Sequence, residues 1–293
     1  MKVLVIGGNG YIGSQLCRVL TLSGLSVDAY GNRHTDYNLL SKEILSQYQY
    51  IVLLAGHSSV PSCNGDLKSP WNNNVRNFTN LIEKLDDQKV IYASSSSVYG
   101  SFFDRECVET DVVCSYMNNY DLTKMVLDQV ASNYMHAGKS IVGLRFGTVA
   151  GASSLIRKDI LLNSMTYSAV MKNEIHIANS EIRRPYLSLA DLSFAISKII
   201  LGDFKSGIYN LANGNCKIID YAKKVQQHTG AEIINKGVTP GVYDFQINTD
   251  KFQKDYKFTF QDNMDNVVSG LIGTYNSGIA KVVDRLTYFQ YNG

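Results

Sequence analysis

The sequence predicts an α/β fold, a doubly wound parallel sheet with a small C-terminal lobe. Residues 2–6 form a short, continuous apolar run, which is typical of a strand buried on both faces of a parallel sheet. A glycine-rich turn and a helical pattern of apolar residues follow it directly. Similar apolar runs at 51–57 and 90–93 are separated by a helical pattern over 70–85, as expected of repeated strand–helix–strand units.

Composition limits the possible functions. A chain of 293 residues with 45% hydrophobic and 18% charged residues suits one large domain, or a principal domain with an appended lobe. The net charge of +2 and the lack of a basic block argue against nucleic acid or membrane partners. The apolar N-terminal run is too short for a signal peptide, and the 5 cysteines include no C-x-x-C pair, so we expect a cytoplasmic protein without a metal site.

The first turn predicts a dinucleotide site. Gly7, Gly10 and Gly13 lie between the first strand and a helical pattern that continues to about residue 22. Glycines at this spacing let the turn close, let the backbone approach a pyrophosphate and let the helix pack on the strand. We expect Tyr11 and Ile12 to contribute there as well, because the free N–H groups of a helix N-terminus attract an anion.

The residues at the end of the second predicted strand bear on whether the cofactor is NAD or NADP(H). Residues 26–30 read as a strand, and an NAD site commonly has an acidic residue where this strand ends. Gly31 stands there instead, followed by Asn32 and Arg33, and a guanidinium can pair with a 2′-phosphate. We therefore expect NADP(H), with NAD as the alternative and Arg33 as an exposed loop charge in that case. Asp36 is a candidate adenine contact.

Two further segments are expected to line the cofactor crevice. Leu54, Ala55 and Gly56 come where a central strand ends, and the carboxyl ends of parallel strands line such crevices. Asn74 lies in the helical pattern that follows. The strand at 90–93 then delivers four serines, Ser94 to Ser97, and one of them is expected to bind a reacting oxygen.

Tyr120 and Lys124 form a candidate catalytic pair. They are four residues apart in a segment, 117–128, that reads as a helix, so both project from one face. An ammonium one turn away would lower the pKa of the phenol, which titrates near pH 10 when unperturbed. The same spacing also occurs on many solvated helix faces, so the surrounding residues must decide between the two interpretations.

Taken together, these motifs resemble those of the extended short-chain dehydrogenase/reductase family, in particular its nucleotide-sugar epimerases, dehydratases and ketoreductases. The matches occur in the family's order over roughly residues 1–270: Gly7-x-x-Gly10-x-x-Gly13, Leu54-Ala55-Gly56, Ser94-Ser95-x-x-Val98-Tyr99-Gly100, Tyr120-x-x-x-Lys124, and the segments 143–151, 184–191 and 209–212. The resemblance implies a Rossmann-type NAD(P)-binding domain from 1–147 plus about 183–225. It implies a nucleotide-sugar-binding lobe from about 148–182 plus 226–293, and a homodimer.

The resemblance also implies roles for individual residues. Tyr120 would exchange a proton with the sugar oxygen, Ser95 would hydrogen-bond that oxygen, and Lys124 would bind the nicotinamide ribose and hold the pKa of Tyr120 down. The cofactor would supply the hydride chemistry.

On the substrate side, the resemblance points to four residues. Arg184 matches an arginine that meets the diphosphate or its ribose, and it is a better candidate than Arg183. Thr148 stands where UDP-galactose 4-epimerases usually have Asn. Asn163 would contact the nucleotide half of the substrate, or else lie on a helix surface, and Ser96 would lie beside the sugar.

Departures from the family pattern narrow the reaction. Ser96 and Ser97 stand where the 4,6-dehydratases have an Asp-Glu pair, and Ser97 also replaces a cysteine of the 3,5-epimerase/4-reductases. We therefore expect NADP(H)-dependent reduction of a 4-keto nucleotide sugar. The alternatives are an NAD-dependent nucleotide-sugar 4-epimerase and, third, a non-catalytic cofactor-sensing protein of the same fold. The segment from Gly31 to Arg33 is what separates reductase from epimerase.

Overall fold

The structure is a computed structural model that describes residues 1–31, 36–101, 105–111 and 118–283. Within it, the predicted α/β class is confirmed by a parallel central sheet of six strands in the order β11-β6-β4-β3-β1-β2. The strands are β1 (Lys2–Ile6), β2 (Ser26–Tyr30), β3 (Tyr50–Leu53), β4 (Lys89–Ala93), β6 (Ile141–Phe146) and β11 (Gly207–Leu211). The central strands β1, β3, β4 and β6 are buried along most of their length, as expected of a parallel sheet that is covered on both faces.

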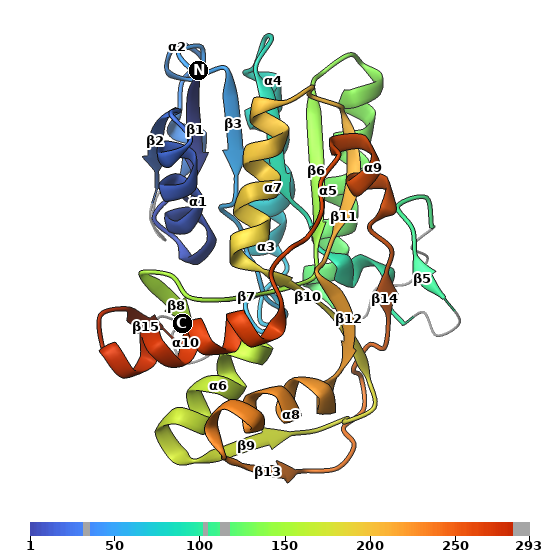
Figure 1. The fold of residues 1–293 in the computed structure, drawn as a ribbon. Helices are drawn as coiled ribbons and strands as arrows, with labels where there is room; N and C mark the ends of the chain where they lie inside the picture. The colour runs from blue at the N-terminus through green and yellow to red at the C-terminus, as the bar shows by residue number, and fades with distance from the viewer. Residues whose placement is uncertain (32–35, 102–104, 112–117, 284–293) are drawn as a thin grey trace.

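Helices cover both faces of this sheet (Figure 1). On one face lie α1 (Tyr11–Leu22) and α7 (Leu189–Leu201), which share a core with β1, β6 and β11. The other face is covered by η1 (Tyr37–Leu39), α2 (Lys42–Leu45), α4 (Asn77–Glu83) and α5 (Asn119–His136). The helix predicted over 70–85 is present, and it runs from α3 (Lys68–Trp71) through a π-helical turn, η2 (Asn72–Arg76), into α4.

A second core lies beyond the carboxyl edge of the sheet, in the lower half of Figure 1. Its helices are α6 (Leu161–Lys172), α8 (Ile218–Thr229) and α10 (Met264–Ser277). A three-stranded sheet of β12 (Gly214–Lys217), β10 (Arg183–Ser188) and β7 (Thr148–Ala150) connects this lobe to the large sheet. Three strand pairs complete the structure: β13 (Glu232–Asn235) with β9 (Glu174–Ile177), β14 (Gln246–Ile247) with β5 (Glu106–Cys107), and β15 (Lys281–Val283) with β8 (Leu155–Arg157).

The two cores do not follow the predicted domain boundaries at every point. Tyr221, Ala222 and Val225 of α8 pack into the second core, although the prediction assigned residues up to 225 to the cofactor domain. Phe252 and Tyr256 of α9 (Asp250–Tyr256) pack into the core of the large sheet, although they were expected in the lobe. Which core each helix joins is decided by the direction of its apolar face, and not by its position along the chain.

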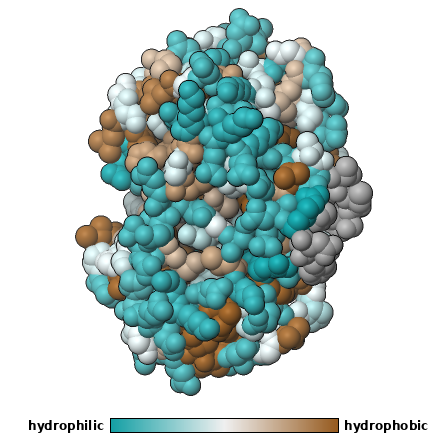
Figure 2. Space-filling view, turned by 45° about the vertical axis from the view of Figure 1, so that its right-hand side comes forward, coloured by the Kyte–Doolittle hydropathy of each residue, from teal (hydrophilic) through white to brown (hydrophobic). Residues whose placement is uncertain are grey.

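The surface is mostly polar. Figure 2 shows hydrophilic side chains over most of one face, with separate hydrophobic areas between them. Within the described part of the chain, no helix is both long and apolar enough to span a bilayer.

Candidate active site

The glycine turn lies between β1 and α1. Gly7 has a φ of +89°, and a Cβ added there would lie 2.8 Å from the backbone nitrogen of Ala55. At Gly13 an added Cβ would lie 2.2 Å from the carbonyl oxygen of Gly7. Gly10 is the N-cap of α1, whose first turn contains no acidic residue. The first backbone N–H groups of the helix, including those of Tyr11 and Ile12, therefore face a place that suits an anion.

The end of β3 closes one side of this turn. Gly56 leaves no room for a side chain, because an added Cβ would lie 2.7 Å from Oδ1 of Asn74. That oxygen accepts from the backbone N–H of His57 at 2.8 Å, and the Asn74 amide nitrogen donates to the His57 carbonyl and to Oγ1 of Thr123, at 3.2 and 3.1 Å. Asn74 thus ties the loop after β3, with Leu54 and Ala55, to helix α5.

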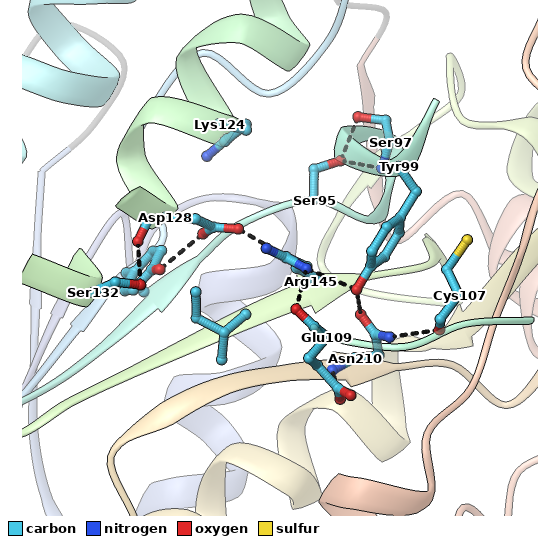
Figure 3. Close-up of polar contacts among 12 residues, drawn as sticks. Ser95, Ser97, Tyr99, Cys107, Glu109, Lys124, Asp128, Ser132, Arg145 and Asn210 are labelled. Atoms are coloured by element: carbon cyan, nitrogen blue, oxygen red, sulfur yellow. Dashed lines mark hydrogen bonds and ion pairs between the residues drawn. The ribbon is translucent and has the colours of Figure 1, made fainter. Parts of the chain in front are cut away.

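Ser95 and Lys124 meet the same edge of the sheet. Ser95 is buried at the N-cap of η3 (Ser96–Tyr99), where its Oγ lies 2.8 Å from Oγ of Ser97 and accepts from the Ser97 N–H at 3.2 Å (Figure 3). Lys124 is also buried, and its Nζ donates to the carbonyl of Ala93 at 2.7 Å. Ala93 is the last residue of β4, so the ammonium is fixed just before the serines.

The pKa of Tyr120 corrects one expectation. Burial raises it to about 12, while a hydrogen bond with Ser95 lowers it and the charge of Asp121 raises it further. Lys124 does not hold this pKa below its usual value, since its ammonium is directed at Ala93. Burial in turn lowers the pKa of Lys124 to about 8, against the attraction of Asp128.

Asp121, the residue after Tyr120, was not predicted from the sequence to belong to the site. Its side chain is buried and accepts hydrogen bonds from Oγ of Ser97 at 2.6 Å, from Nδ2 of Asn118 at 2.6 Å and from the hydroxyl of Tyr243. Burial raises its pKa in spite of these donors. An acidic residue in the first turn of a helix is ordinary, and Tyr243 lies far along the chain, so the only signal in the sequence was the position beside Tyr120.

A buried ion pair lies beneath the face of α5 that carries Lys124. Nε of Arg145 lies 2.8 Å from Oδ2 of Asp128, and both side chains are buried. Tyr92 donates to the other oxygen of Asp128, and Arg145 also donates to the Tyr99 hydroxyl, which in turn donates to Oδ1 of Asn210. Figure 3 shows this network leading from Asp128 across the sheet to Asn210. It fixes α5, and with it Lys124, against β4, β6 and β11.

The lobe contributes a cavity of about 290 Å³ lined by Thr148 and Arg184 together with apolar side chains, among them Leu161, Met165 and Ile177. The Arg184 guanidinium lies 5.3 Å from the ring centroid of Phe245 and 5.8 Å from that of Tyr243, and burial lowers its pKa. Arg183, by contrast, pairs with Asp244 through Nε at 3.0 Å. Of the two neighbours, Arg184 is the one that faces the cavity. Ser96 is buried at the start of η3.

Asn163 does not lie where a substrate contact was expected. It is fully buried, and its oxygen accepts from the Gly151 N–H at 3.1 Å. Its nitrogen donates to the hydroxyl of Tyr11 at 3.2 Å and to the carbonyl of Arg157 at 3.0 Å. The amide is therefore used to join α6 to α1, and it is not among the residues that line the cavity.

Of the residues expected to distinguish NADP(H) from NAD, the structure describes only some. Asn32 and Arg33 lie outside the described residues. Gly31 follows β2 with a φ of +86°, and its carbonyl accepts from Nδ2 of Asn9 at 3.3 Å. Asp36 is exposed, and its carboxylate accepts from the backbone N–H of Asn38 at 2.9 Å as the N-cap of η1.

These features fit a bound dinucleotide. The turn from Gly7 to Gly13 has backbone atoms where Cβ atoms would collide, and a helix N-terminus faces it. Ser94, at the end of β4, has the only buried side-chain oxygen or nitrogen without a hydrogen-bond partner among the residues that the structure describes. An orphaned hydroxyl at this edge suits a polar ligand.

Comparisons with known proteins agree with this arrangement. A sequence profile of the NAD dependent epimerase/dehydratase family matches residues 3–212. A UDP-glucose 4-epimerase of Lactobacillus helveticus is 29% identical over 281 residues, covering 80% of this chain and 83% of that protein.

Two solved structures share the fold. MoeE5 in complex with UDP-glucuronic acid and NAD has a TM-score of 0.84 at 22% identity, covering 95% of this chain and 100% of its own. RMD from Pseudomonas aeruginosa complexed with NADPH has a TM-score of 0.81 at 16% identity, covering 94% of this chain and 99% of its own. By its profile match, its sheet and its motifs, this chain belongs to the NAD dependent epimerase/dehydratase family, within the extended short-chain dehydrogenases/reductases.

Proposed function

We propose that this protein is an NAD-dependent 4-epimerase of a nucleoside-diphosphate sugar, which removes a hydride from the sugar ring and returns it to the opposite face. The observation behind this proposal is the convergence of Ser95, Tyr120 and Lys124 on the sheet edge that also holds the glycine turn. The similarity to a UDP-glucose 4-epimerase over most of both chains favours this reaction over the reduction that the sequence alone suggested.

The cofactor side of the site follows from the geometry. The N–H groups of the turn and of the first helical residues, from Gly10 to Gly13, would hold the pyrophosphate. Lys124, fixed to Ala93, would bind the nicotinamide ribose. The cofactor supplies a hydride acceptor when it is bound. Tyr120, with Ser95 beside it, would take the proton of the sugar hydroxyl and later give one back.

The lobe would hold the other half of the substrate. Arg184 is a half-buried cation that lines a cavity and forms no ion pair with a carboxylate among the described residues, so a diphosphate is a fitting partner. The apolar cavity wall with Thr148 suits the flat face of a base or sugar. Ser96 would lie on the sugar side, at the start of η3.

A second candidate is an NADP(H)-dependent 4-ketoreductase, favoured by Gly31. Nothing acidic stands at the end of β2, and the carboxylate within it, Asp28, is bonded to Tyr48 at 2.8 Å and lies 3.1 Å from Nζ of Lys2. A site that has no acidic residue at the end of this strand leaves room for the 2′-phosphate of NADP(H). RMD, whose fold is shared, was solved with NADPH.

The first test identifies the nucleotide released when the purified protein is denatured. The epimerase predicts tightly held NAD, and an epimerised product when the NAD-loaded protein receives UDP-glucose or UDP-glucuronic acid. The reductase predicts an exchangeable site that binds NADPH more tightly than NADH. A cofactor-binding protein that leaves both nucleotide sugars and 4-keto sugars unchanged would support the third, non-catalytic reading.

Tyr120→Phe tests the site itself. This variant removes only the hydroxyl, so it should bind NAD as well as the wild type while turnover falls by at least about a hundredfold, the usual contribution of a general acid–base. Wild-type turnover in Tyr120→Phe would contradict the assignment of the site.

A further inference from the structure

We propose that Asp121 is the terminal proton acceptor of a relay in which the hydroxyls of Ser95 and Ser97 connect it to Tyr120. The proposal rests on the proposed function, because it assigns the destination of the proton that Tyr120 removes from the sugar. We call Ser95, Ser97 and Asp121 the serine relay. Asp121 is buried in the protein and does not touch the substrate in this scheme.

Two links of the relay are hydrogen bonds in the structure, and the third, between the Tyr120 hydroxyl and Ser95, belongs to the proposal. Ser95 is the side chain whose interaction with Tyr120 lowers the pKa of that phenol. Oγ of Ser95 lies 2.8 Å from Oγ of Ser97, and Ser97 donates to Oδ1 of Asp121 at 2.6 Å. These distances are normal or short for O–H···O bonds, so each proton would move only a fraction of the separation.

The direction of each bond follows from counting protons. A serine hydroxyl donates one hydrogen bond and accepts two. Ser97 uses its proton on the carboxylate, so in the bond between the serines Ser95 must be the donor. Oγ of Ser95 already accepts from the Ser97 N–H, and its remaining acceptor position is free for the phenol of Tyr120. The hydroxyls of Ser95 and Ser97 thus both point toward Asp121, and in the proposed relay the hydroxyl of Tyr120 would do the same.

The charged and titratable groups around Asp121 come from several elements. Tyr243 and Asn118 donate to it, Arg184 of β10 favours its ionised form, and Tyr120 and Cys63 lie close enough to feel its charge. Because burial works against the ionised form, this carboxyl can accept a proton more readily than an exposed one.

The proton and electron balance is closed. When bound, the cofactor would supply the acceptor for the hydride of the sugar carbon, and the sugar hydroxyl would lose its proton to the oxygen of Tyr120. Tyr120 passes its own proton to Ser95, Ser95 passes one to Ser97, and Ser97 passes one to Asp121. The sugar carbon would thus be oxidised to a ketone by loss of two electrons to the hydride acceptor, and the proton would rest on Asp121. Reduction of the ketone reverses every transfer, which suits a reaction that must return the proton.

A purely electrostatic role for Asp121 predicts the opposite sign. The negative charge of Asp121 raises the pKa of Tyr120 and therefore hinders its ionisation. If charge were its only influence, Asp121→Asn would lower the pKa of Tyr120, increase the fraction of phenolate and speed the oxidation step. The relay predicts that this variant is slower, because the acceptor has been removed.

The experiment measures the rate at which NAD-loaded protein is reduced by UDP-glucose in a single turnover, over a range of pH and in mixtures of H₂O and D₂O. We expect Ser97→Ala and Asp121→Asn to lose about a hundredfold or more at neutral pH, within the usual range for proton-transfer catalysis. Their rates should rise with pH, because hydroxide must replace the relay. The wild type should show a curved dependence on the deuterium fraction, since several protons move, and Ser97→Ala a linear one.

Matched variants separate the relay from structure. Ser97→Thr keeps the hydroxyl and should restore the rate and the curvature. Asn118→Ala removes the cap of α5 and one donor to Asp121 but no member of the relay, so it should lower the melting temperature without making the isotope dependence linear. The relay would be wrong if Ser97→Ala and Asp121→Asn were reduced at the wild-type rate, or if Asp121→Asn were faster than the wild type. If Tyr120→Phe were also fully active, the proposed function would fail instead.

A second readout needs no turnover. In ¹³C-tyrosine-labelled protein, the Tyr120 signal, assigned with Tyr120→Phe, should shift when Asp121 is protonated, because the bonds of the relay then reverse. This shift should be largely lost in Ser97→Ala and kept in Ser97→Thr. A shift of equal size in Ser97→Ala would mean that the two groups interact only through space, and the relay would be wrong.

Discussion

At the scale of single residues, Gly13 is the least replaceable part of the turn. An added methyl group would lie 2.2 Å from the Gly7 carbonyl oxygen, which is rigid backbone. We expect Gly13→Ala to displace the turn and weaken NAD binding at least about tenfold, an effect of about 1.4 kcal/mol. Titration of NAD by calorimetry measures it.

Gly273→Ala is the control for that substitution. Gly273 is exposed in α10, and an added Cβ there meets no atom within 4 Å. Alanine in a helix interior should stabilise the protein by about 0.5–1 kcal/mol without changing the affinity for NAD. A turn that tolerated Gly13→Ala with wild-type affinity would mean that the pyrophosphate lies elsewhere.

Lys124 makes stability depend on pH in a defined direction. Burial lowers its pKa in the folded protein from 10.5 to about 8, so between these values the unfolded chain binds more protons than the folded one. The free energy of unfolding therefore rises with pH across this window, by about 3 kcal/mol from this one group.

Lys124→Met should remove that contribution. Urea unfolding of wild type and variant at several pH values from about 7 to about 10.5 isolates it, because the other titrating groups cancel in the difference. Parallel stability curves would show that the ammonium is not buried in the way the structure describes.

Prediction from sequence was uneven at this scale. The glycines, Ser95, Tyr120 and Lys124 could be proposed as site residues because their spacing along the chain is short and specific. Asp121 was not, because its environment is made by Ser97 and Tyr243, which approach it only in the folded chain. The effect of burial on Tyr120 likewise cannot be read from a spacing of four residues.

At the scale of elements, helix α5 depends on the ion pair beneath it. Asp128 and Arg145 are buried, and removing one partner leaves a buried charge unpaired. We expect Asp128→Ala to lower the free energy of unfolding by about 3–5 kcal/mol. Asp86→Ala removes a much more exposed ion pair, with Lys42, and should cost less than about 1 kcal/mol. Denaturant unfolding of both variants makes the comparison, and equal losses would contradict it.

The elements of the large sheet were predictable because its central strands β1, β3 and β4 are compact, mostly apolar runs. Residues 2–6 and 26–30 match β1 and β2, and the segment with Tyr120 and Lys124 is helical. The lobe was harder to predict. Its three-stranded sheet joins β7, β10 and β12, which are short and far apart in the chain, and the π-helical turn at 72–76 has no pattern of its own.

At the scale of the whole molecule, the two cores are joined near the cofactor turn. The hydroxyl of Tyr11 in α1 donates to the Gly151 carbonyl at 2.8 Å, and Asn163 of the lobe reaches the same hydroxyl. A hydrogen bond between two serines reinforces the junction, because Oγ of Ser14 lies 2.9 Å from Oγ of Ser153. This junction places the cofactor turn in one body and Arg184 in the other, with the catalytic edge between them.

That division predicts that binding of the two ligands can be impaired separately. Arg184→Gln should weaken UDP, used as a probe of the nucleotide half of the substrate, by about 1.5–3 kcal/mol, the usual contribution of a hydrogen bond to a charged group. Its affinity for NAD should stay within about twofold, because the glycine turn belongs to the other core. Gly13→Ala should show the reverse pattern.

Arg183→Gln is the matched control, because Arg183 is the neighbour of Arg184 on β10 but pairs with Asp244. It should lower stability while its UDP affinity falls less than that of Arg184→Gln. Calorimetric titration of each variant with UDP and with NAD gives all of these values. Equal losses of UDP affinity in Arg183→Gln and Arg184→Gln would contradict the assignment of the cavity that contains Thr148 and Arg184 as the nucleotide site. The substrate would then have to bind at the edge of the large sheet, without this cavity.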